Sequence, residues 1–420
     1  MEPEQAAPIV VQKYGGSSVA DAERLRLVAD RVAATYRSGK RVVVVVSAMG
    51  KTTDQLIDLA KAVSTTPPRR ELDMLISTGE RISMALLAMA LDRLGVPAIS
   101  FTGSQSGILT NDRHSGARII EVRPVRIQDE LDRNKVVIVA GFQGMSYKRE
   151  ITTLGRGGSD TTAVALAAAL GAEACEIYSD VDGVYSADPR VVPEARRLDE
   201  VSYEEMQELA EHGAKVLNAQ AVEWARKAGI VLYARATGGK TGGGTGETRI
   251  GGAPREDRGA LAVTGTRRLM CVRLPDPNAE LAPRLLALLG EEGVVLRQWR
   301  LRHGGQGERD GRGVEVRFVC DDLPDWPRVA ARLGELPGCR IEEHGAVVVV
   351  GTGVGSDPHR VARALAAVRA TGAVVHDCDA TPLRLLLVVP PAAVDEVTRA
   401  LHAELVARAV ETPQGQQRAS

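Results

Sequence analysis

The stretch Thr152-Thr-Leu-Gly-Arg-Gly-Gly-Ser-Asp-Thr-Thr-Ala163 combines a cation, Arg156, with three glycines, several hydroxyl groups and a carboxylate, Asp160. It runs directly into an apolar helical segment, residues 163–170. Glycines leave backbone N–H groups open to a ligand, and a helix N-terminus is partially positive, so the stretch predicts an anion site. Arg156 can hold a carboxylate or phosphate through two parallel hydrogen bonds. The alternative, a tight turn capping a core helix through Ser159 or Asp160, explains the glycines but not the arginine.

The composition indicates a soluble globular protein of two or three domains. The chain has 420 residues, of which 44% are hydrophobic and 25% charged, and its net charge of -1 does not indicate nucleic acid or an anionic membrane as the main partner. Its five cysteines are scattered and without a CxxC pair, which argues against a disulfide scaffold or a zinc site. The N-terminus lacks the apolar core of a signal peptide, and no apolar segment reaches the roughly 20 residues of a membrane span. A cytoplasmic location is therefore expected.

Strands and helices are expected to alternate through the first half of the chain. The pattern predicts strands at 9–12, 41–46, 98–101, 136–140 and 175–178, and helices at 21–37, 81–94 and 162–170. Such alternation is typical of an α/β layer fold with a mostly parallel sheet.

A cluster of small and polar residues follows most of these strands. The clusters are 13–18, 47–54, 77–80, 141–144 and 179–185. In parallel α/β sheets, ligands bind outside the carboxyl ends of the strands. The sequence therefore predicts one ligand site on one rim of the sheet.

The second half of the chain has a different pattern. Residues 237–259 are rich in glycine and non-periodic, so we interpret them as a flexible linker rather than a phosphate-binding loop. Beyond them, two successive units of strand, helix, strand, strand and helix are predicted, one over 260–343 and one over 344–412. Each unit has the order of a ferredoxin-like domain, and such sheets often mediate dimerisation.

Four motifs in the first half resemble the aspartate kinase family, most closely its lysine- and threonine-regulated bacterial type. They are Lys13-Tyr-Gly-Gly-Ser-Ser-Val19, Gly79-Glu-Arg-Ile-Ser83, Thr153-Leu-Gly-Arg-Gly-Gly-Ser-Asp160 and the segment 178–190. The resemblance extends over about residues 10–235, and the second half resembles the paired ACT regulatory domains of the family more weakly.

The resemblance implies a three-layer αβα sandwich of the amino acid kinase type, followed by tandem ferredoxin-like ACT domains. The domain boundaries expected are 1–236 for the catalytic domain, 237–259 for the linker, 260–343 and 344–412 for the two ACT-like domains, and 413–420 for a disordered tail. A homo-oligomer, a dimer or higher, is expected to form through the ACT-like domains.

The family transfers the γ-phosphoryl group of ATP to the side-chain carboxylate of L-aspartate, giving 4-phospho-L-aspartate for lysine, threonine and methionine biosynthesis. A carboxylate is already ionised at neutral pH, so the reaction needs no strong general base. The barrier lies in bringing two anions together and in neutralising the transferred group. Cations and backbone N–H groups should therefore dominate the site.

The resemblance assigns roles to individual residues. Lys13 would contact the transferred phosphoryl group, Arg156 the α-carboxylate of the substrate and Glu80 its α-ammonium, while Asp160 would orient Lys13 or the ammonium. The remaining substrate-binding positions are Thr52, Thr53, Gly157, Gly158 and Ser159.

The nucleotide positions carried over from the family are Lys13, Tyr14, Gly15, Gly16, Ser47, Ser159, Ser179, Asp180, Tyr185, Asp188, Pro189, Arg190 and Lys215. Mg²⁺ should arrive on the ATP phosphates and keep several waters, so no metal cage made only of protein groups is expected.

The sequence departs from the family pattern where regulation is expected. The Gln-Asn pair that binds effectors in the family is Gln298-Trp299 here, and the family's Ser-Glu-Ile is replaced by the segment 379–382. A bulky ring in place of an amide would fill or reshape an amino-acid pocket. After Arg235 the family's last short strand is also in doubt. We therefore expect an intact aspartate kinase whose inhibition by lysine and threonine is weakened or altered.

Two other functions fit parts of the sequence. Glu80 and Arg156 would recognise the two α groups of the substrate and would not discriminate between side chains of different length. The possibility of a kinase for another acidic amino acid in specialised metabolism therefore stays open. A non-catalytic amino-acid-binding regulator is the second alternative, although the retention of Lys13, Arg156 and Asp160 argues against it. A nicotinamide-dependent oxidoreductase would need a dinucleotide fingerprint after the first strand, which Gly15-Gly16 does not provide.

Overall fold

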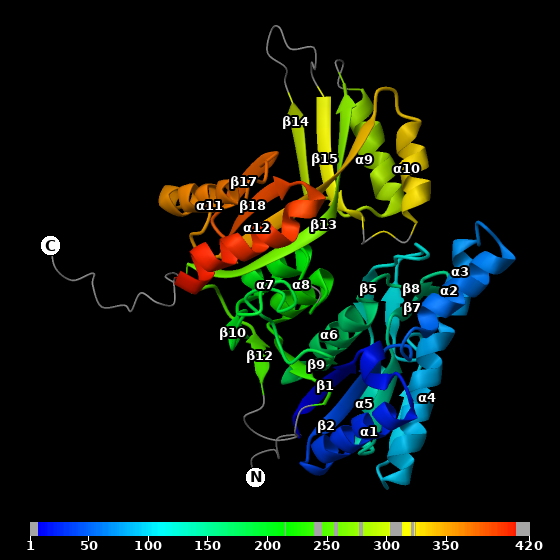
Figure 1. Ribbon diagram of the computed structural model, residues 1–420. Helices are drawn as coiled ribbons and strands as arrows, with labels where there is room; N and C mark the ends of the chain where they lie inside the picture. The colour runs from blue at the N-terminus through cyan, green and yellow to red at the C-terminus, as the bar shows by residue number, and fades with distance from the viewer. Residues whose placement is uncertain are drawn as a thin grey trace, which may run out of the picture. The chain divides into compact units, whose positions relative to one another are not determined.

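The computed structural model describes residues 7–214, 216–238, 246–255, 259–276, 280–302, 313–320, 323 and 325–408. The chain forms two compact units (Figure 1). The first consists of Met1–Val184, Arg197–Ala210 and Lys215–Pro254, and the second of Tyr185–Arg196, Glu211–Ala214 and Arg255–Ser420. Two short segments that interrupt the sequence of the first unit, Tyr185–Arg196 and Glu211–Ala214, therefore belong to the second unit.

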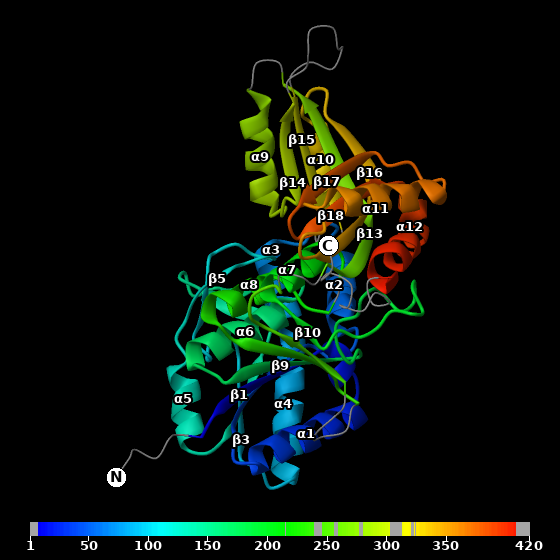
Figure 2. The same cartoon turned by 90° about the vertical axis from the view of Figure 1, so that its left-hand side faces the viewer.

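An eight-stranded sheet forms the centre of the first unit (Figure 2). In spatial order its strands are β10 (Glu200–Val201), β12 (Glu247–Ile250), β11 (Val231–Ala236), β9 (Ala174–Ser179), β1 (Ile9–Tyr14), β2 (Arg41–Val46), β6 (Val136–Ala140) and β3 (Ala98–Phe101). The strands from β11 to β3 run parallel, and β12 runs antiparallel to β11. The predicted α/β fold with a mostly parallel sheet is confirmed.

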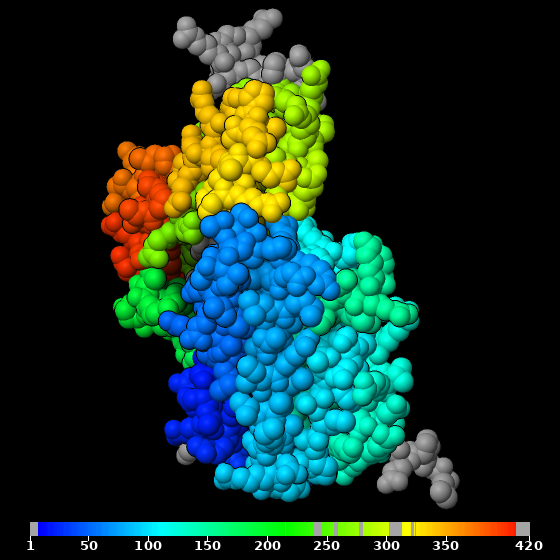
Figure 3. Space-filling model, turned by 90° about the vertical axis from the view of Figure 1, so that its right-hand side faces the viewer, coloured from blue at the N-terminus to red at the C-terminus, as the bar shows by residue number. Residues whose placement is uncertain are grey.

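Helices cover both faces of this sheet. The helices of the first unit are α1 (Ala22–Arg37), α2 (Thr52–Val63), α3 (Arg69–Ile76), α4 (Thr78–Arg93), α5 (Val125–Asp132), α6 (Gly158–Leu170), α7 (Tyr203–Glu211) and α8 (Ala219–Ala228), with a 3₁₀ turn η1 (Gly16–Val19) after β1. In Figure 3 the helices α2 to α4, in blue, line the surface of this unit.

The valines of β2 explain its central place. Val42, Val44 and Val46 are buried in one cluster with side chains of α1 and α4. Val43 and Val45 point to the other face of the sheet, which α6 covers, and are also fully buried. A continuous apolar run is typical of a strand buried on both faces.

A small four-stranded sheet lies beside the large one and was not anticipated from the sequence. Its order is β5 (Ile119–Val122), β4 (Ile108–Thr110), β7 (Gln143–Ser146) and β8 (Ile151–Thr153). Strand β8 leads directly into the Arg156 turn and α6. This small sheet therefore sets the point from which the arginine-bearing turn begins.

The second unit contains one six-stranded sheet. Its order is β14 (Gln298–Arg302), β15 (Gly313–Val319), β13 (Ala260–Pro275), β16 (Arg340–Gly351), β18 (Arg384–Val389) and β17 (Asp377–Thr381). The helices are α9 (Leu281–Glu292), α10 (Trp326–Gly334), α11 (Pro358–Ala370) and α12 (Val394–Leu401), with η3 (Pro391–Ala393) before α12 and η4 (His402–Ala407) after it.

This sheet is built from two repeats of the predicted ferredoxin-like order. In each repeat the third strand pairs with the first and the second, giving β13-β15-β14 and β16-β18-β17. The long strands β13 and β16 pair with each other, so each repeat supplies the fourth strand of the other. Each repeat also has its own hydrophobic cluster, one under α9 and α10 and one under α11 and α12.

One expectation from the sequence needs correction. The linker prediction is wrong for residues 247–250, which form β12 between β10 and β11.

The helical stretch Arg69–Arg93, which contains α3 and α4, is long and apolar enough by composition to cross a membrane. However, 44% of its most apolar window is buried inside the protein, and a core helix meets the same criteria, so this is weak evidence for a span.

The place of β12 in the fold gives a test. Thr248 is fully buried, donates its hydroxyl to the Leu198 carbonyl at 2.6 Å and accepts the Val184 N–H at 2.8 Å. Thr248→Val would leave both backbone groups unpaired, so we expect the free energy of unfolding to fall by about 1–3 kcal/mol. Urea denaturation measures this, with Thr65→Val at an exposed position as control; equal stability of both variants would contradict the placement of β12.

Candidate active site

The carboxyl ends of four neighbouring strands meet at one rim of the large sheet. Tyr14 at the end of β1 pairs in register with Val46 of β2 and Tyr178 of β9, and Val46 pairs with Ala140 of β6. The loops that follow these strands therefore lie side by side. The predicted convergence of polar clusters on one rim is confirmed for these four loops.

Glycines allow these loops to approach one another closely. A Cβ atom at Gly16 would lie 2.9 Å from the Ala48 carbonyl oxygen, and one at Gly141 would lie 2.7 Å from Ser159 Oγ. The Gly50 N–H also donates to the Gly16 carbonyl at 3.0 Å. Any side chain at these glycines would push the rim loops apart, and the backbone could not then approach a phosphate.

Lys13 and Asp160 form an ion pair at the centre of the rim. Lys13 Nζ lies 2.6 Å from Asp160 Oδ1, and the two side chains are only 12% and 11% exposed. Asp160 lies in the first turn of α6, where the helix carries partial positive charge. Of the two roles expected for Asp160, the geometry favours the orientation of Lys13.

Arg156 lies on the turn between β8 and α6. Its side chain is exposed, and within the described part of the chain its guanidinium makes no hydrogen bond or ion pair. Asn218 Nδ2 donates a hydrogen bond to the Arg156 carbonyl at 3.0 Å, which holds the backbone of the turn in place. Flanking Gly155 and Gly157 have φ values of 77° and 69°, in the left-handed region that favours glycine. A fixed turn thus presents an uncompensated cation.

Glu80 lies in the first turn of α4 and is 3% exposed. Its Oε1 accepts the Ala48 N–H at 3.2 Å, whereas Oε2 is buried without a hydrogen-bond partner among the described residues. Burial raises the pKa of this carboxyl to about 7, and hydrogen bonds from the backbone of Glu80 itself and of Ala48 only partly offset the effect. A buried carboxylate oxygen without a partner is suited to a ligand cation.

The predicted hydroxyl groups also lie near the rim. Ser47 follows β2 and donates its N–H to the Tyr14 carbonyl at 3.1 Å, and Ser159 is buried beside Gly141. Thr52 and Thr53 open α2; the Thr52 hydroxyl donates to the Met49 carbonyl at 2.7 Å. Gly157 caps the N-terminus of α6, and Gly158 is its first residue.

The predicted nucleotide residues are divided between the two units. Ser179 ends β9 and Asp180 follows it in the first unit, whereas Tyr185, Asp188, Pro189 and Arg190 belong to the second. Asp188 and Arg190 form an ion pair of 2.7 Å in their own loop. Lys215 lies outside the described residues. The nucleotide role of this set stays a prediction.

Tyr14 differs from the expectation for a nucleotide contact. Its side chain is fully buried, stacks on the Tyr178 ring at 4.8 Å and donates its hydroxyl to Gln12 at 3.2 Å. Gln12 in turn donates to Glu176 at 2.8 Å. The ring therefore holds β1 to β9, and any contact of Tyr14 with a nucleotide is limited to its backbone.

The sequence reasoning missed two parts of the site. The loop after β6 was recognised as polar, but not the close contact of Gly141 with Ser159. Asp73 on α3 was not singled out, although it is fully buried and accepts hydrogen bonds from Thr153. A lone aspartate within a helical segment carries no signal of burial in the sequence.

Comparisons with known proteins agree with this geometry. The sequence model of the amino acid kinase family matches residues 8–233. The chain is 44% identical over 405 residues to an aspartokinase of Mycolicibacterium smegmatis, covering 94% of this chain and 95% of the relative. It is 43% identical over 413 residues to an aspartokinase of Corynebacterium glutamicum, with coverage of 94% and 95%.

Solved structures show the same fold. Escherichia coli aspartokinase III in complex with aspartate and ADP matches with a TM-score of 0.81 at 24% identity, over 94% of this chain and 99% of that one. An aspartate kinase from Synechocystis is 34% identical, with a TM-score of 0.53 and coverage of 94% and 68%.

The chain therefore belongs to the amino acid kinase family. Its relatives match over nearly their whole length, and its activity is that of an aspartate kinase, an ATP-using phosphotransferase with a carboxyl group as acceptor.

The raised pKa of Glu80 gives a test of the site. The folded protein keeps this proton up to about pH 7 and the unfolded chain only to about 4.5, so the stabilising contribution is present below pH 4.5 and lost as pH rises through 7. Glu80→Gln removes this loss, and we expect it to raise the free energy of unfolding of the ligand-free protein by about 1–3 kcal/mol at pH 8.

The gain should shrink as the pH is lowered toward 5, because the wild-type carboxyl is then protonated as well. Urea denaturation at a series of pH values measures it. Glu23→Gln, on the exposed first turn of α1, is the control and should show no such pH dependence. A destabilised Glu80→Gln protein at pH 8 would contradict the assigned environment.

Proposed function

We propose that the rim of the large sheet is where the phosphoryl group passes from ATP to aspartate, with Lys13 as the contacting cation. The observation that carries this proposal is the Lys13–Asp160 ion pair of 2.6 Å, which joins the end of β1 to the first turn of α6. The pair holds the ammonium group beside the Gly15 backbone, since a Cβ atom at Gly15 would lie 3.5 Å from Lys13 Nζ. An ammonium held in place costs no reorganisation when charge develops on the transferred group.

The two α groups of the substrate are assigned to Glu80 and Arg156. The exposed guanidinium suits a two-pronged bond to the α-carboxylate, and the unpaired Glu80 Oε2 suits the α-ammonium. Because the ammonium favours the ionised carboxylate, its binding should lower the pKa of Glu80 from about 7. Escherichia coli aspartokinase III, which has this fold, was solved with aspartate and ADP.

ATP is proposed to lie over the carboxyl ends of β1 and β9, with Ser179 and Asp180 among its contacts. Mg²⁺ would be held by the ATP phosphates and water, because the Asp160 carboxylate at the rim is already paired with Lys13. A metal cage made only of protein groups is therefore not part of this proposal. Bound Mg²⁺ would neutralise part of the negative charge of the ATP phosphates.

The second unit is proposed to be a pair of ACT-like regulatory domains, within residues 260–343 and 344–412, with weakened or altered response to lysine and threonine. Gln298 Oε1 already accepts a hydrogen bond from Arg317 at 2.9 Å. Trp299 lies on β14 with its side chain 54% exposed. Escherichia coli aspartokinase III, which has this fold, was also solved in complex with lysine and aspartate.

A charged cluster supports this weakened response. Arg300 and Arg317 of one repeat pair with Asp377 of the other at 2.7 and 2.5 Å, and Asp379 pairs with Arg384 at 2.9 Å. Charges that already satisfy one another gain little from an amino-acid effector.

We also propose a cytoplasmic location, a role in aspartate-family biosynthesis and a homo-oligomer formed through this unit.

A first experiment tests the site through ATP-dependent hydroxamate formation with aspartate. Lys13→Met should lower kcat by about 10²- to 10³-fold, because it removes the cation at the transferred group. Arg156→Ala should raise KM for aspartate by about 10- to 100-fold, because a charged two-pronged bond is lost.

Lys61→Met and Arg118→Ala, at exposed positions elsewhere in the first unit, are the controls. Wild-type kinetics in both site variants would overturn the assignment. Glutamate and longer analogues, offered in competition, decide whether the acceptor is another acidic amino acid.

A second experiment tests regulation. Lysine and threonine, alone and together, are titrated into a coupled kinase assay of the full chain. We expect little inhibition at millimolar concentrations, because the Gln298 amide and the cluster around Asp377 are engaged within the protein. Strong joint inhibition would refute the proposal.

A further inference from the structure

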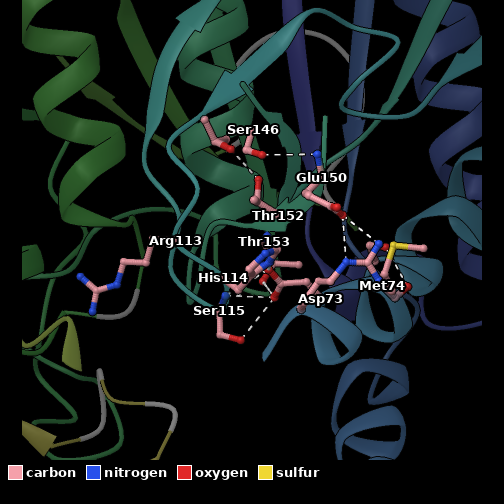
Figure 4. Close-up of polar contacts among 12 residues, drawn as sticks. Asp73, Met74, Arg113, His114, Ser115, Ser146, Glu150, Thr152 and Thr153 are labelled. Carbon is pink, nitrogen blue, oxygen red and sulfur yellow. Dashed lines mark hydrogen bonds and ion pairs between the residues drawn. The ribbon is translucent and has the colours of Figure 1, made fainter. Parts of the chain in front are cut away.

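A fully buried carboxylate on α3, Asp73, joins three segments of the first unit (Figure 4). Its oxygens accept the Ser115 N–H at 3.0 and 3.1 Å and the Ser115 hydroxyl at 3.3 Å. They also accept the Thr153 N–H at 3.2 Å and the Thr153 hydroxyl at 2.6 Å. His114 Nδ1 lies 2.9 Å away. The carboxylate is thus saturated with donors from the loop before β5 and from the end of β8.

One side of this hub controls the start of the arginine-bearing turn. Thr153 is the last residue of β8 and stands three positions before Arg156. Its carbonyl accepts the N–H groups of Gly116 and Ala117 at 3.1 and 2.8 Å, so its backbone is held on both sides. The turn from residue 154 to residue 157 therefore begins from a fixed point.

The other side of the hub belongs to the helical stretch that carries Glu80. The Ser77 N–H donates to the Asp73 carbonyl at 3.1 Å, and the Ser77 carbonyl accepts from Gln143 Nε2 at 2.9 Å. These bonds fix the junction between α3 and α4, three residues before Glu80. Asp73 thus connects the segment that bears Glu80 with the segment that bears Arg156.

We propose that Asp73 is a positioning residue that sets the separation of Glu80 and Arg156, and so the fit of the α-amino acid end of the substrate. The proposal rests on the proposed function of those two residues. An amino acid presents its ammonium and carboxylate at a fixed spacing, so a small displacement of one partner weakens both contacts. Lys13 and Asp160 are held by a separate ion pair, so the phosphoryl end should be unaffected.

The chemistry of the hub requires a carboxylate. The Ser115 and Thr153 N–H groups can only donate, so their partner must be an acceptor at both oxygens. Asparagine has the same shape but would turn its NH₂ group toward one of these donors. Asp73→Asn is therefore a change of hydrogen-bond polarity at constant volume.

The experiment compares steady-state kinetics of Asp73→Asn and wild type. We expect KM for aspartate to rise by about 10- to 100-fold, while kcat and KM for ATP stay within about two-fold. A merely structural role would lower the amount of active enzyme and leave KM for aspartate unchanged. Asp112→Asn is the matched control, because Asp112 pairs with exposed Lys148 at 2.8 Å in the same part of the unit.

A milder pair of variants keeps the test decisive if Asp73→Asn does not fold. Thr153→Val removes only the hydroxyl donor and should raise KM for aspartate by about 3- to 10-fold, and Thr153→Ser should restore it. Unchanged KM for aspartate in Thr153→Val, or equal changes in KM for aspartate and for ATP, would overturn the proposal.

Arg156→Ala measured in parallel separates the two claims. If Arg156→Ala raises KM for aspartate and the Asp73 and Thr153 variants do not, only the positioning role is wrong. If Arg156→Ala also has no effect, the assignment of the substrate site is wrong, and the positioning role with it.

Discussion

The ion pair between Lys13 and Asp160 is the interaction on which the site depends. It joins the end of β1 to the first turn of α6, two segments separated by about 150 residues, at a distance of 2.6 Å. The parallel register of β9, β1, β2 and β6 makes this possible, because it brings every carboxyl end to the same rim. With both partners nearly buried, the attraction is weakly screened and the ammonium stays in place before any ligand arrives.

Around this pair, the site keeps charges that the fold itself does not neutralise. Glu80 has a buried oxygen without a partner in the described chain, and burial raises the pKa of the group to about 7. The Arg156 guanidinium is exposed on a turn shaped by two glycines with positive φ. Such local conflicts with stability are expected at functional sites, because the groups are arranged for a ligand rather than for each other.

The second unit contains charges that are paired with one another inside the protein. Its two repeats share one sheet through β13 and β16, and Arg300 and Arg317 bind Asp377 across the repeats. The pairing of long central strands makes the two repeats a single structural element, although each retains its own hydrophobic cluster. Duplication is thus visible in the order of the elements and also in the separation of the cores.

The sequence by itself determined the fold class, the alternation of strands and helices, and the residue types of the site, because these follow from local periodicity and from glycine-rich motifs such as 153–160. It did not reveal β12, because a short strand beside a glycine tract has no periodicity, and it gave Tyr14 a nucleotide role although its ring is buried against Tyr178. Only the tertiary structure decided that Asp160 pairs with Lys13 and that Asp73 joins Ser115 to Thr153. Contacts between residues tens of positions apart depend on register and burial, and a single sequence does not encode these as a local pattern.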